Sequence, residues 1–327
     1  MPMTQEELLS KLDAAIKALT TSDLGPSKLQ PEVADRYIRK AIDTSKMLRE
    51  CRVLPMRSDT RNIDKIGFAS RILQAATEAT EPGTTSKPTF EQRTLTVKEV
   101  IAAVDVSYST LEDNIERGQL EQTLLDLIAE RASADLEELF LYADPSSSDT
   151  FIKLLGHRDW LTMTEADDGV HVEDYEGSEP DKISDVFKTL LNKVPHKYFG
   201  NLAQWRFYCA FSAERKYREE LAERATAAGD RALLEDVPVF YQGIPVIWVP
   251  KIVVETRNIG GSDKPNCTDV LFCHPSNLVV GFRREVDMER ERKPRARTVE
   301  ITVTARCDCN VEEPDAIAIA RNVSLGS

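Results

Sequence analysis

The sequence lacks any apolar run long enough to span a bilayer, and its first residues show neither the basic nor the apolar segment of a secretory signal. It has no glycine-rich phosphate loop, no Gly-x-Ser-x-Gly elbow and no His-Glu-x-x-His pair. Basic residues number 42 against 55 acidic ones, a formal net charge of −13. This balance argues against an unaided grip on nucleic acid, which needs clustered Lys and Arg, but it allows loose, non-specific confinement.

Histidine and cysteine are also scarce, with four and six residues. The histidines share no metal-ligand spacing, and surface or structural roles are the better interpretation of each: His157, His171, His196 and His274. One cluster suggests zinc, namely Cys307-Asp308-Cys309 with Cys267, Cys273 and His274 upstream. Against zinc, residues two apart on a strand lie roughly 6.5–7 Å apart, too far for two thiolates on one tetrahedral ion without distortion. We therefore predict no metal, no cofactor and no catalytic residue, and read the scattered cysteines as those of a protein made in a reducing cytoplasm.

A hydrophobic content of 41% and a charged content of 30% in 327 residues are typical of a soluble globular protein with one large or two ordinary domains. The first fifty residues predict two helices that form an arm, because neither has an obvious partner nearby.

Residues 52–109 are mainly extended and predict a long two-stranded hairpin. The returning strand changes its apolar face near Lys98 and Glu99, which predicts a bulge or a bend. The tip, Glu81 to Pro88, is rich in Pro, Gly, Ser and Thr. With roughly twenty residues a side, the hairpin would reach on the order of 60 Å, and a ribbon of that kind is not stable alone in water. We expect it to lie on another subunit.

The clearest predicted helix runs from Gly118 to Ala143, about 39 Å at 1.5 Å per residue. Its polar residues, among them Glu130, Arg131 and Glu137, are expected to face away from the apolar stripe. That stripe consists of Leu120, Leu124, Leu127, Ile128, Ala132, Leu136, Leu139 and Phe140.

The rest of the chain predicts a compact α/β unit over residues 181–275, then a second hairpin and a final strand that includes Ile317 and Ile319. The second hairpin turns at a basic tip. This tip could contact phosphate or pair with acidic loops of a neighbouring subunit, and the acidic composition of the chain favours the second. Its basic residues are Arg290, Arg292, Lys293, Arg295 and Arg297.

This order of elements resembles the major capsid protein of tailed bacteriophages, with the Hong-Kong-97-type fold. The resemblance covers about 270 residues and rests on four segments in the family's order: "VDVSYSTLEDN", "VPHKYFGNLAQWRFYCAFSAERKYREEL", "YQGIPVIWVPKI" and "HPSNLVVGFRREVDMER". It implies an α+β fold with an N-terminal arm (1–52), an extended loop (53–112), a spine helix with the first part of a peripheral domain (113–180), an axial domain (181–275) and the second peripheral part (276–327).

The resemblance also implies a function. Subunits would assemble in the host cytoplasm into hexamers and pentamers of an icosahedral virion shell around packaged double-stranded DNA, with a portal and a separate scaffolding protein as further partners. Expected subunit contacts are the loop tip, with Glu81, Gly83 and Lys87, and the basic hairpin tip. The fifty N-terminal residues are short for a scaffold, and no covalent cross-link is assigned to Lys87. The alternatives are an encapsulin-like nanocompartment shell and, more distantly, an α+β enzyme.

Overall fold

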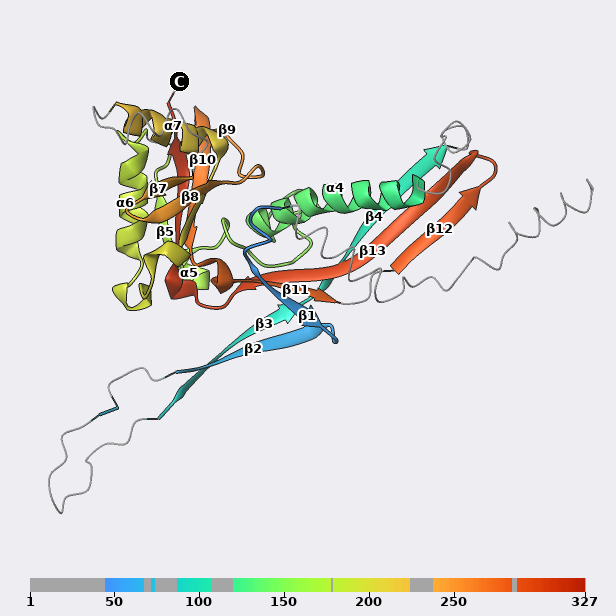
Figure 1. The fold of residues 1–327 in the computed structure, drawn as a ribbon, viewed down its shortest axis with the longest axis horizontal. Helices are drawn as coiled ribbons and strands as arrows, with labels where there is room; N and C mark the ends of the chain where they lie inside the picture. The colour runs from blue at the N-terminus through green and yellow to red at the C-terminus, as the bar shows by residue number, and fades with distance from the viewer. Residues whose placement is uncertain are drawn as a thin grey trace, which may run out of the picture.

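The computed structural model describes residues 45–67, 72–73, 87–107, 120–177, 179–223, 238–283 and 287–326. Its strands form three sheets, of five, seven and two strands. The two-stranded sheet is a ribbon that runs out from the body of the molecule (Figure 1). No helix in these ranges combines the length and the hydropathy that a bilayer crossing needs. The two helices predicted for the N-terminal arm fall almost wholly outside the described residues.

The five-stranded sheet is organised around β13 (Thr298–Val311). Along β13 every second side chain from Val299 to Val303 is buried, as are Cys307 and Cys309, which gives the strand an apolar face. β11 and β12 pair with successive parts of one edge of β13, β4 pairs with the other edge, and β1 pairs in parallel with β11. The predicted terminal hairpin is thereby confirmed. These strands are β1 (Arg52–Met56), β4 (Lys98–Ser107), β11 (Leu278–Arg283) and β12 (Asp287–Lys293).

The returning arm of the extended hairpin is divided between two sheets, which corrects the sequence interpretation. Only β3 (Thr89–Thr96) pairs with the outgoing strand β2 (Thr60–Gly67), whereas β4 pairs with β13 over ten residues. Val97 separates β3 from β4. The change of apolar face predicted as a bulge is therefore the point where the chain exchanges one partner strand for another. The alternation alone carried no information about which strand β4 would join.

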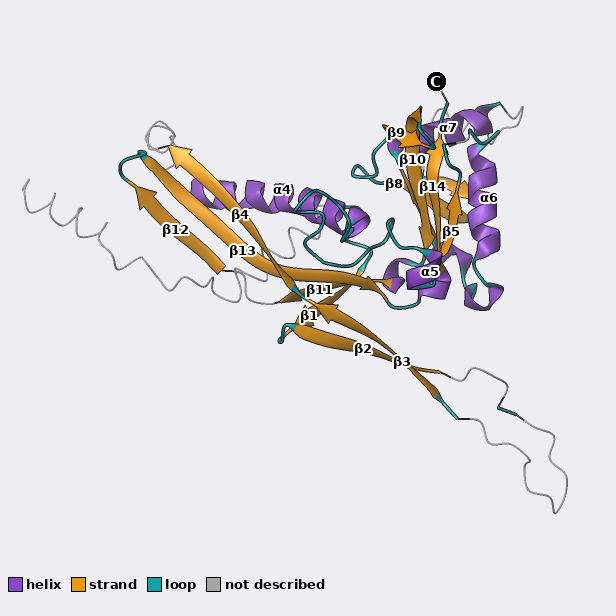
Figure 2. Cartoon of the chain, turned by 180° about the vertical axis from the view of Figure 1, so that it is seen from behind, coloured by secondary structure: helices purple, strands orange, loops and turns teal. Residues whose placement is uncertain are grey.

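The seven-stranded sheet has the strand order β5-β14-β10-β6-β8-β7, with β9 paired to β10, and we call the part of the molecule built on it the axial unit. The final strand belongs here, paired with β10 and β5, although the sequence interpretation groups it with the peripheral hairpin. Helices α6 (Ile183–Lys193) and α7 (Phe211–Ala222) lie beside this sheet (Figure 2). The strands are β5 (His171–Asp174), β6 (Arg206–Cys209), β7 (Val239–Tyr241), β8 (Ile244–Trp248), β9 (Glu255–Ile259), β10 (Ser262–Cys273) and β14 (Ile317–Ser324).

Short helices connect these elements: α5 (Glu165–Asp168), η1 (His196–Tyr198), η2 (Leu202–Gln204), η3 (Pro275–Asn277) and η4 (Pro314–Ala316). The largest core cluster contains residues of both large sheets, for example Leu271 and Ile319 of the seven-stranded sheet with Val280 and Cys307 of the five-stranded one. The two sheets therefore share buried contacts.

The spine helix α4 (Leu120–Tyr142) confirms the predicted element and lies along the five-stranded sheet (Figures 1 and 2). Ile128, Leu136 and Phe140 are buried, but Leu127 is 56% exposed. At 100° per residue, Leu127 lies on the far side of Ile128 from Leu136 and Phe140, and its exposure shows that it does not belong to the buried stripe. Glu137 is a second correction, because its side chain is buried and accepts a hydrogen bond from Ser45 Oγ at 2.5 Å.

The segment before β1 fastens the spine helix to the axial unit. Met47 and Leu48 lie in the shared core. The Glu50 carboxylate accepts hydrogen bonds from Tyr208 Oη at 2.9 Å and from Arg206 Nε at 3.2 Å, both on β6. The Lys46 ammonium stands 3.1 Å from the centroid of the Trp248 ring, a cation–π contact. A short stretch of chain thus holds three parts of the molecule together.

Candidate assembly surfaces

The ribbon formed by β2 and β3 presents apolar side chains that its own subunit leaves uncovered. Ile66 and Phe90 are directly opposed in the antiparallel register and are 66% and 72% exposed. The ribbon extends away from both large sheets (Figure 1). A two-stranded hairpin has no core of its own and is at best marginally stable in water, so this surface favours contact with another molecule.

Of the loop-tip residues predicted as subunit contacts, the structure describes only Lys87. Lys87 is exposed and lies two residues before β3, while Glu81 and Gly83 lie outside the described residues.

At its base the ribbon is tightly packed on the five-stranded sheet. Ile63, Leu95 and Val97 form a buried cluster with Met56 and Val279. Lys65 forms an ion pair with Glu313, and Arg283 pairs with Asp59. The ribbon is therefore anchored at one end and exposed at the other, as a segment that reaches a neighbour needs to be.

Gly281 on β11 makes this close packing possible. A Cβ atom there would lie 2.6 Å from Met56 Sδ and 3.2 Å from Leu95 Cδ1, both of which belong to the buried cluster. The absence of a side chain on β11 lets the base of the ribbon approach the sheet.

The tip of the β12–β13 hairpin carries the predicted basic group. Arg292, Arg295 and Arg297 are exposed, and none of them makes an ion pair with a described residue. Lys293 pairs with Glu300 at 2.5 Å, and this contact raises the pKa of Lys293. The structure places the remaining member, Arg290, on β12 opposite Ile301. Glu300 comes seven residues after Lys293 in the sequence and meets it only across the hairpin, so this pair was not predictable from local spacing.

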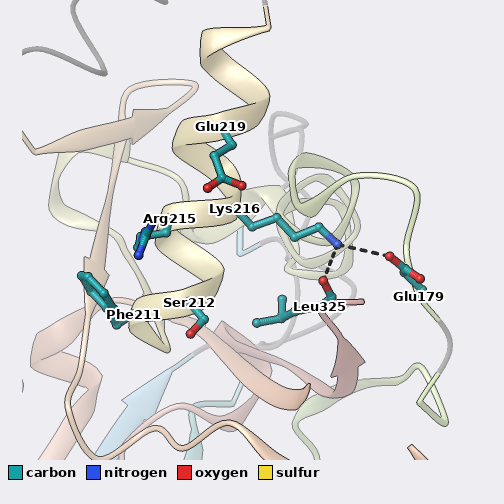
Figure 3. Close-up of a pocket in the computed structure, with 7 residues that line it drawn as sticks. All are labelled: Glu179, Phe211, Ser212, Arg215, Lys216, Glu219 and Leu325. Atoms are coloured by element: carbon teal, nitrogen blue, oxygen red, sulfur yellow. Dashed lines mark hydrogen bonds and ion pairs between the residues drawn. The ribbon is translucent and has the colours of Figure 1, made fainter. Parts of the chain in front are cut away.

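An open cavity of about 440 Å³ lies on the outer side of α7 in the axial unit. Lys216 reaches from α7 across it, donates a hydrogen bond to the Leu325 carbonyl at 3.0 Å and lies 3.7 Å from Glu179 (Figure 3). Phe211 is 51% exposed at its edge, with the Arg215 guanidinium 5.9 Å from the ring centroid. The cavity is lined by an aromatic ring and by groups of both charges, a mixture that suits contact with a protein surface.

Comparison with known proteins identifies what kind of chain carries these surfaces. Residues 28–322 match the phage capsid family. The chain belongs to that family. The putative prophage capsid protein YqbE of Bacillus subtilis strain 168 is 34% identical over 320 residues, which cover 97% of this chain and 98% of that protein.

Solved capsid structures share the fold of this capsid family member. The satellite phage P4 procapsid, solved with its size determination protein, matches with a TM-score of 0.66 at 13% identity, covering 99% of both chains. The capsid of an empty GTA particle matches with a TM-score of 0.60 at 16% identity, covering 86% of this chain and 90% of that one. The Hong-Kong-97-type α+β fold is confirmed. The chain is a structural protein of the phage virion and is located in its capsid shell.

The cysteines of this capsid protein are buried. Cys267, Cys273, Cys307 and Cys309 are fully inaccessible to solvent, and burial raises the pKa of the last three. Cys307 and Cys309 lie on the apolar face of β13, where they pack as small hydrophobic residues. Within the ranges that the structure covers, no three His, Cys, Asp or Glu side chains are arranged to hold a metal ion.

A buried charged cluster beside these cysteines was not predicted. It joins Asp308 of β13 to His157 and Asp159 of the loop that follows α4. His157 Nε2 lies 3.0 Å from the Cys309 carbonyl oxygen, 3.3 Å from Asp159 Oδ2 and 3.6 Å from Asp308 Oδ1. No sequence signal marks this group, because Asp308 is about 150 residues from His157 and Asp159 and neither aspartate stands in an acidic run.

Proposed function

We propose that this protein builds its shell through the exposed ribbon and the basic hairpin tip, as hexamers and pentamers of an icosahedral capsid without catalytic activity of its own. The observation that carries the proposal is the exposed Ile66–Phe90 pair on a ribbon whose described residues are buried only at its base. Covering both side chains on a neighbour would contribute roughly 1.5–3 kcal/mol each at most.

The basic hairpin tip would be the second contact. Among the described residues, no acidic side chain forms an ion pair with Arg292, Arg295 or Arg297. An acidic surface of another subunit would therefore complement them. Exposed ion pairs are individually worth at most about 1 kcal/mol, but the same contact recurs at every equivalent position of a shell.

The family and the charge of the chain support a proposal for the contents and further partners of the shell. We infer that double-stranded DNA is confined without specific recognition, because a net charge of −13 provides no general attraction to phosphate. A portal and a separate scaffolding protein complete the proposed set of partners. The prophage capsid relative supports a virion shell over a nanocompartment.

Shell yield from purified protein tests the ribbon contact. We expect the double variant Ile66→Thr with Phe90→Thr to fold normally, because both side chains are exposed and threonine favours strands, yet to form far fewer shells. Ile66→Val with Phe90→Tyr is the matched control, since it keeps most of the apolar area. Yields are measured by sedimentation and checked by electron microscopy. Normal yields from the threonine variant would overturn the proposal.

A further inference from the structure

The buried cluster lies where the chain leaves the five-stranded sheet to form the ribbon. The ladder between β13 and β4 ends at the pair Cys307–Lys98. One step further, the Thr96 N–H donates instead to the side chain of Asp308, with 2.5 Å between N and Oδ2, and the Val97 N–H donates to the Asp59 carbonyl at 3.0 Å. Asp308 therefore supplies the acceptor that a neighbouring strand would otherwise offer, and holds the base of the ribbon.

Asp308 is not an isolated charge. Its side chain is 1% exposed and that of Asp159 is 0% exposed, and the single cation facing both among the described residues is His157. The Cys309 thiol also donates to Asp159, while the second oxygen of each carboxylate has no hydrogen-bond partner in the described part of the chain. Keeping two buried carboxylates fully ionised beside one cation is costly. The groups of the cluster therefore stay protonated to a higher pH than exposed groups of the same kind.

We propose that His157, Asp159 and Asp308 form a proton-sensitive latch that fixes the ribbon to the five-stranded sheet and releases protons when it opens. The latch is a property of the subunit fold and does not depend on the proposed assembly contacts. It makes the anchoring of the ribbon responsive to pH.

The direction of the response follows from the surroundings of each group. Burial raises the pKa of Asp308 to about 7, against the attraction of His157. Burial opposes the charge on His157, but the hydrogen bond to Asp159 and the two carboxylates outweigh it and raise the pKa of His157 to about 9. In an open junction both groups meet water and return toward their ordinary values near 4 and 6.5. The closed latch thus binds more protons than the open one between about pH 4 and 9, and closing weakens as the pH rises.

The other ionisable groups at the junction belong to the same neighbourhood. The thiols of Cys307 and Cys309 flank Asp308 on β13, and burial raises the pKa of both, so they remain protonated in this range. On the exposed side, Arg306 pairs with Glu99 at 3.0 Å and with Asp59 at 3.5 Å. These pairs join β4 and the turn before β2 to the sheet without contacting the buried carboxylates.

Hydrogen exchange at the junction tests the latch in the unassembled subunit, so the result is independent of shell formation. Amide protection in residues 94–98 is measured at pH 5.5 and pH 8.5 and corrected for intrinsic exchange with the unfolded protein. We expect protection to fall by at least about tenfold from the lower to the higher pH. Asp308→Asn retains an acceptor but removes one of the two groups that titrate in this range, so its protection should change less than that of the parent. Equal corrected protection at both pH values in the parent would overturn the proposal.

A matched histidine pair on the other sheet provides the control. His171 Nε2 lies 3.2 Å from Asp315 Oδ1, a similar contact that involves neither His157 nor Asp308, so His171→Gln should leave the pH response of residues 94–98 unchanged. If Asp308→Asn does not fold, His157→Gln decides the matter, because it leaves two buried carboxylates without a cation, and amide protection at pH 8.5 should then be lower than in the parent. Protection at pH 8.5 equal to that of the parent would refute the latch.

Discussion

Replacing Gly281 by alanine probes the packing that anchors the ribbon. The added Cβ would lie 2.6 Å from Met56 Sδ, closer than real Cβ contacts allow, and 3.2 Å from Leu95 Cδ1. Both neighbours are buried, at 1% and 0% exposure, so Met56 has little room in which to move away. Overpacking of this kind costs about 1–3 kcal/mol.

An opposing effect comes from the unfolded chain. Alanine restricts that chain more than glycine does, which stabilises a protein by about 0.4–1 kcal/mol where the native backbone accepts it. Gly281 does not have a positive φ, so this gain applies. The clash exceeds it, and we expect Gly281→Ala to lower the free energy of unfolding by about 1–2 kcal/mol.

Gly200 provides a control of opposite sign. No atom lies within 4 Å of the position that a Cβ would take there, and its φ is not positive, so Gly200→Ala gains the entropic benefit without the clash. Urea unfolding of unassembled subunits compares the midpoints at equal slopes. A Gly281→Ala subunit as stable as the parent would refute the packing argument. In a Met56→Val background, where the clashing sulfur is absent, the same substitution should cost less.

On the spine helix, Leu136→Ala should lower the free energy of unfolding by about 2–5 kcal/mol, because Leu136 is buried. Leu127 is exposed, so Leu127→Ala should change that free energy by no more than about 0.5 kcal/mol. Equal effects in urea unfolding would show that the stripe is wrongly assigned. Arg292→Glu with Arg295→Glu should leave the subunit folded and reduce shell yield, and high salt should reduce the yield of the parent as well. Sedimentation across a salt series measures both, and equal yields without a salt effect would mean that the tip is only a solvated turn. Deletion of residues 81–88 should give a folded subunit that assembles poorly, and normal particles from it would contradict the proposed role of the loop tip.

Patterns of local origin were predictable from the sequence. The alternation along β13 and the helical spacing in α4 reflect one buried face each, so they identified both elements, most of the buried residues of β13 and half of the buried residues described in α4. The resemblance to phage capsid proteins then supplied the arrangement of those elements.

The pairing of strands with one another was not predictable in the same way. β4 alternates apolar and polar residues as any half-buried strand does. This alternation would be the same whether β4 paired with β2 or with β13. Similarly, the apolar residues of β14 fit either large sheet, and only the structure shows them beside β10.

Buried polar groups were the least visible from sequence. Glu137 resembles a solvent-facing residue of an amphipathic helix until Ser45, distant in the chain, is placed against it. Asp308 alternates with two apolar cysteines and would face solvent if the base of the ribbon did not cover it. Their environments depend on contacts between distant segments, which local periodicity does not encode.

The covering of the ribbon in the assembled shell is the central claim, and electron cryomicroscopy of assembled particles at side-chain resolution tests it most directly. We predict that Ile66 and Phe90, exposed in the isolated subunit, are buried against another copy of the chain. Closed shells in which both side chains of the ribbon remain in contact with solvent would contradict the account.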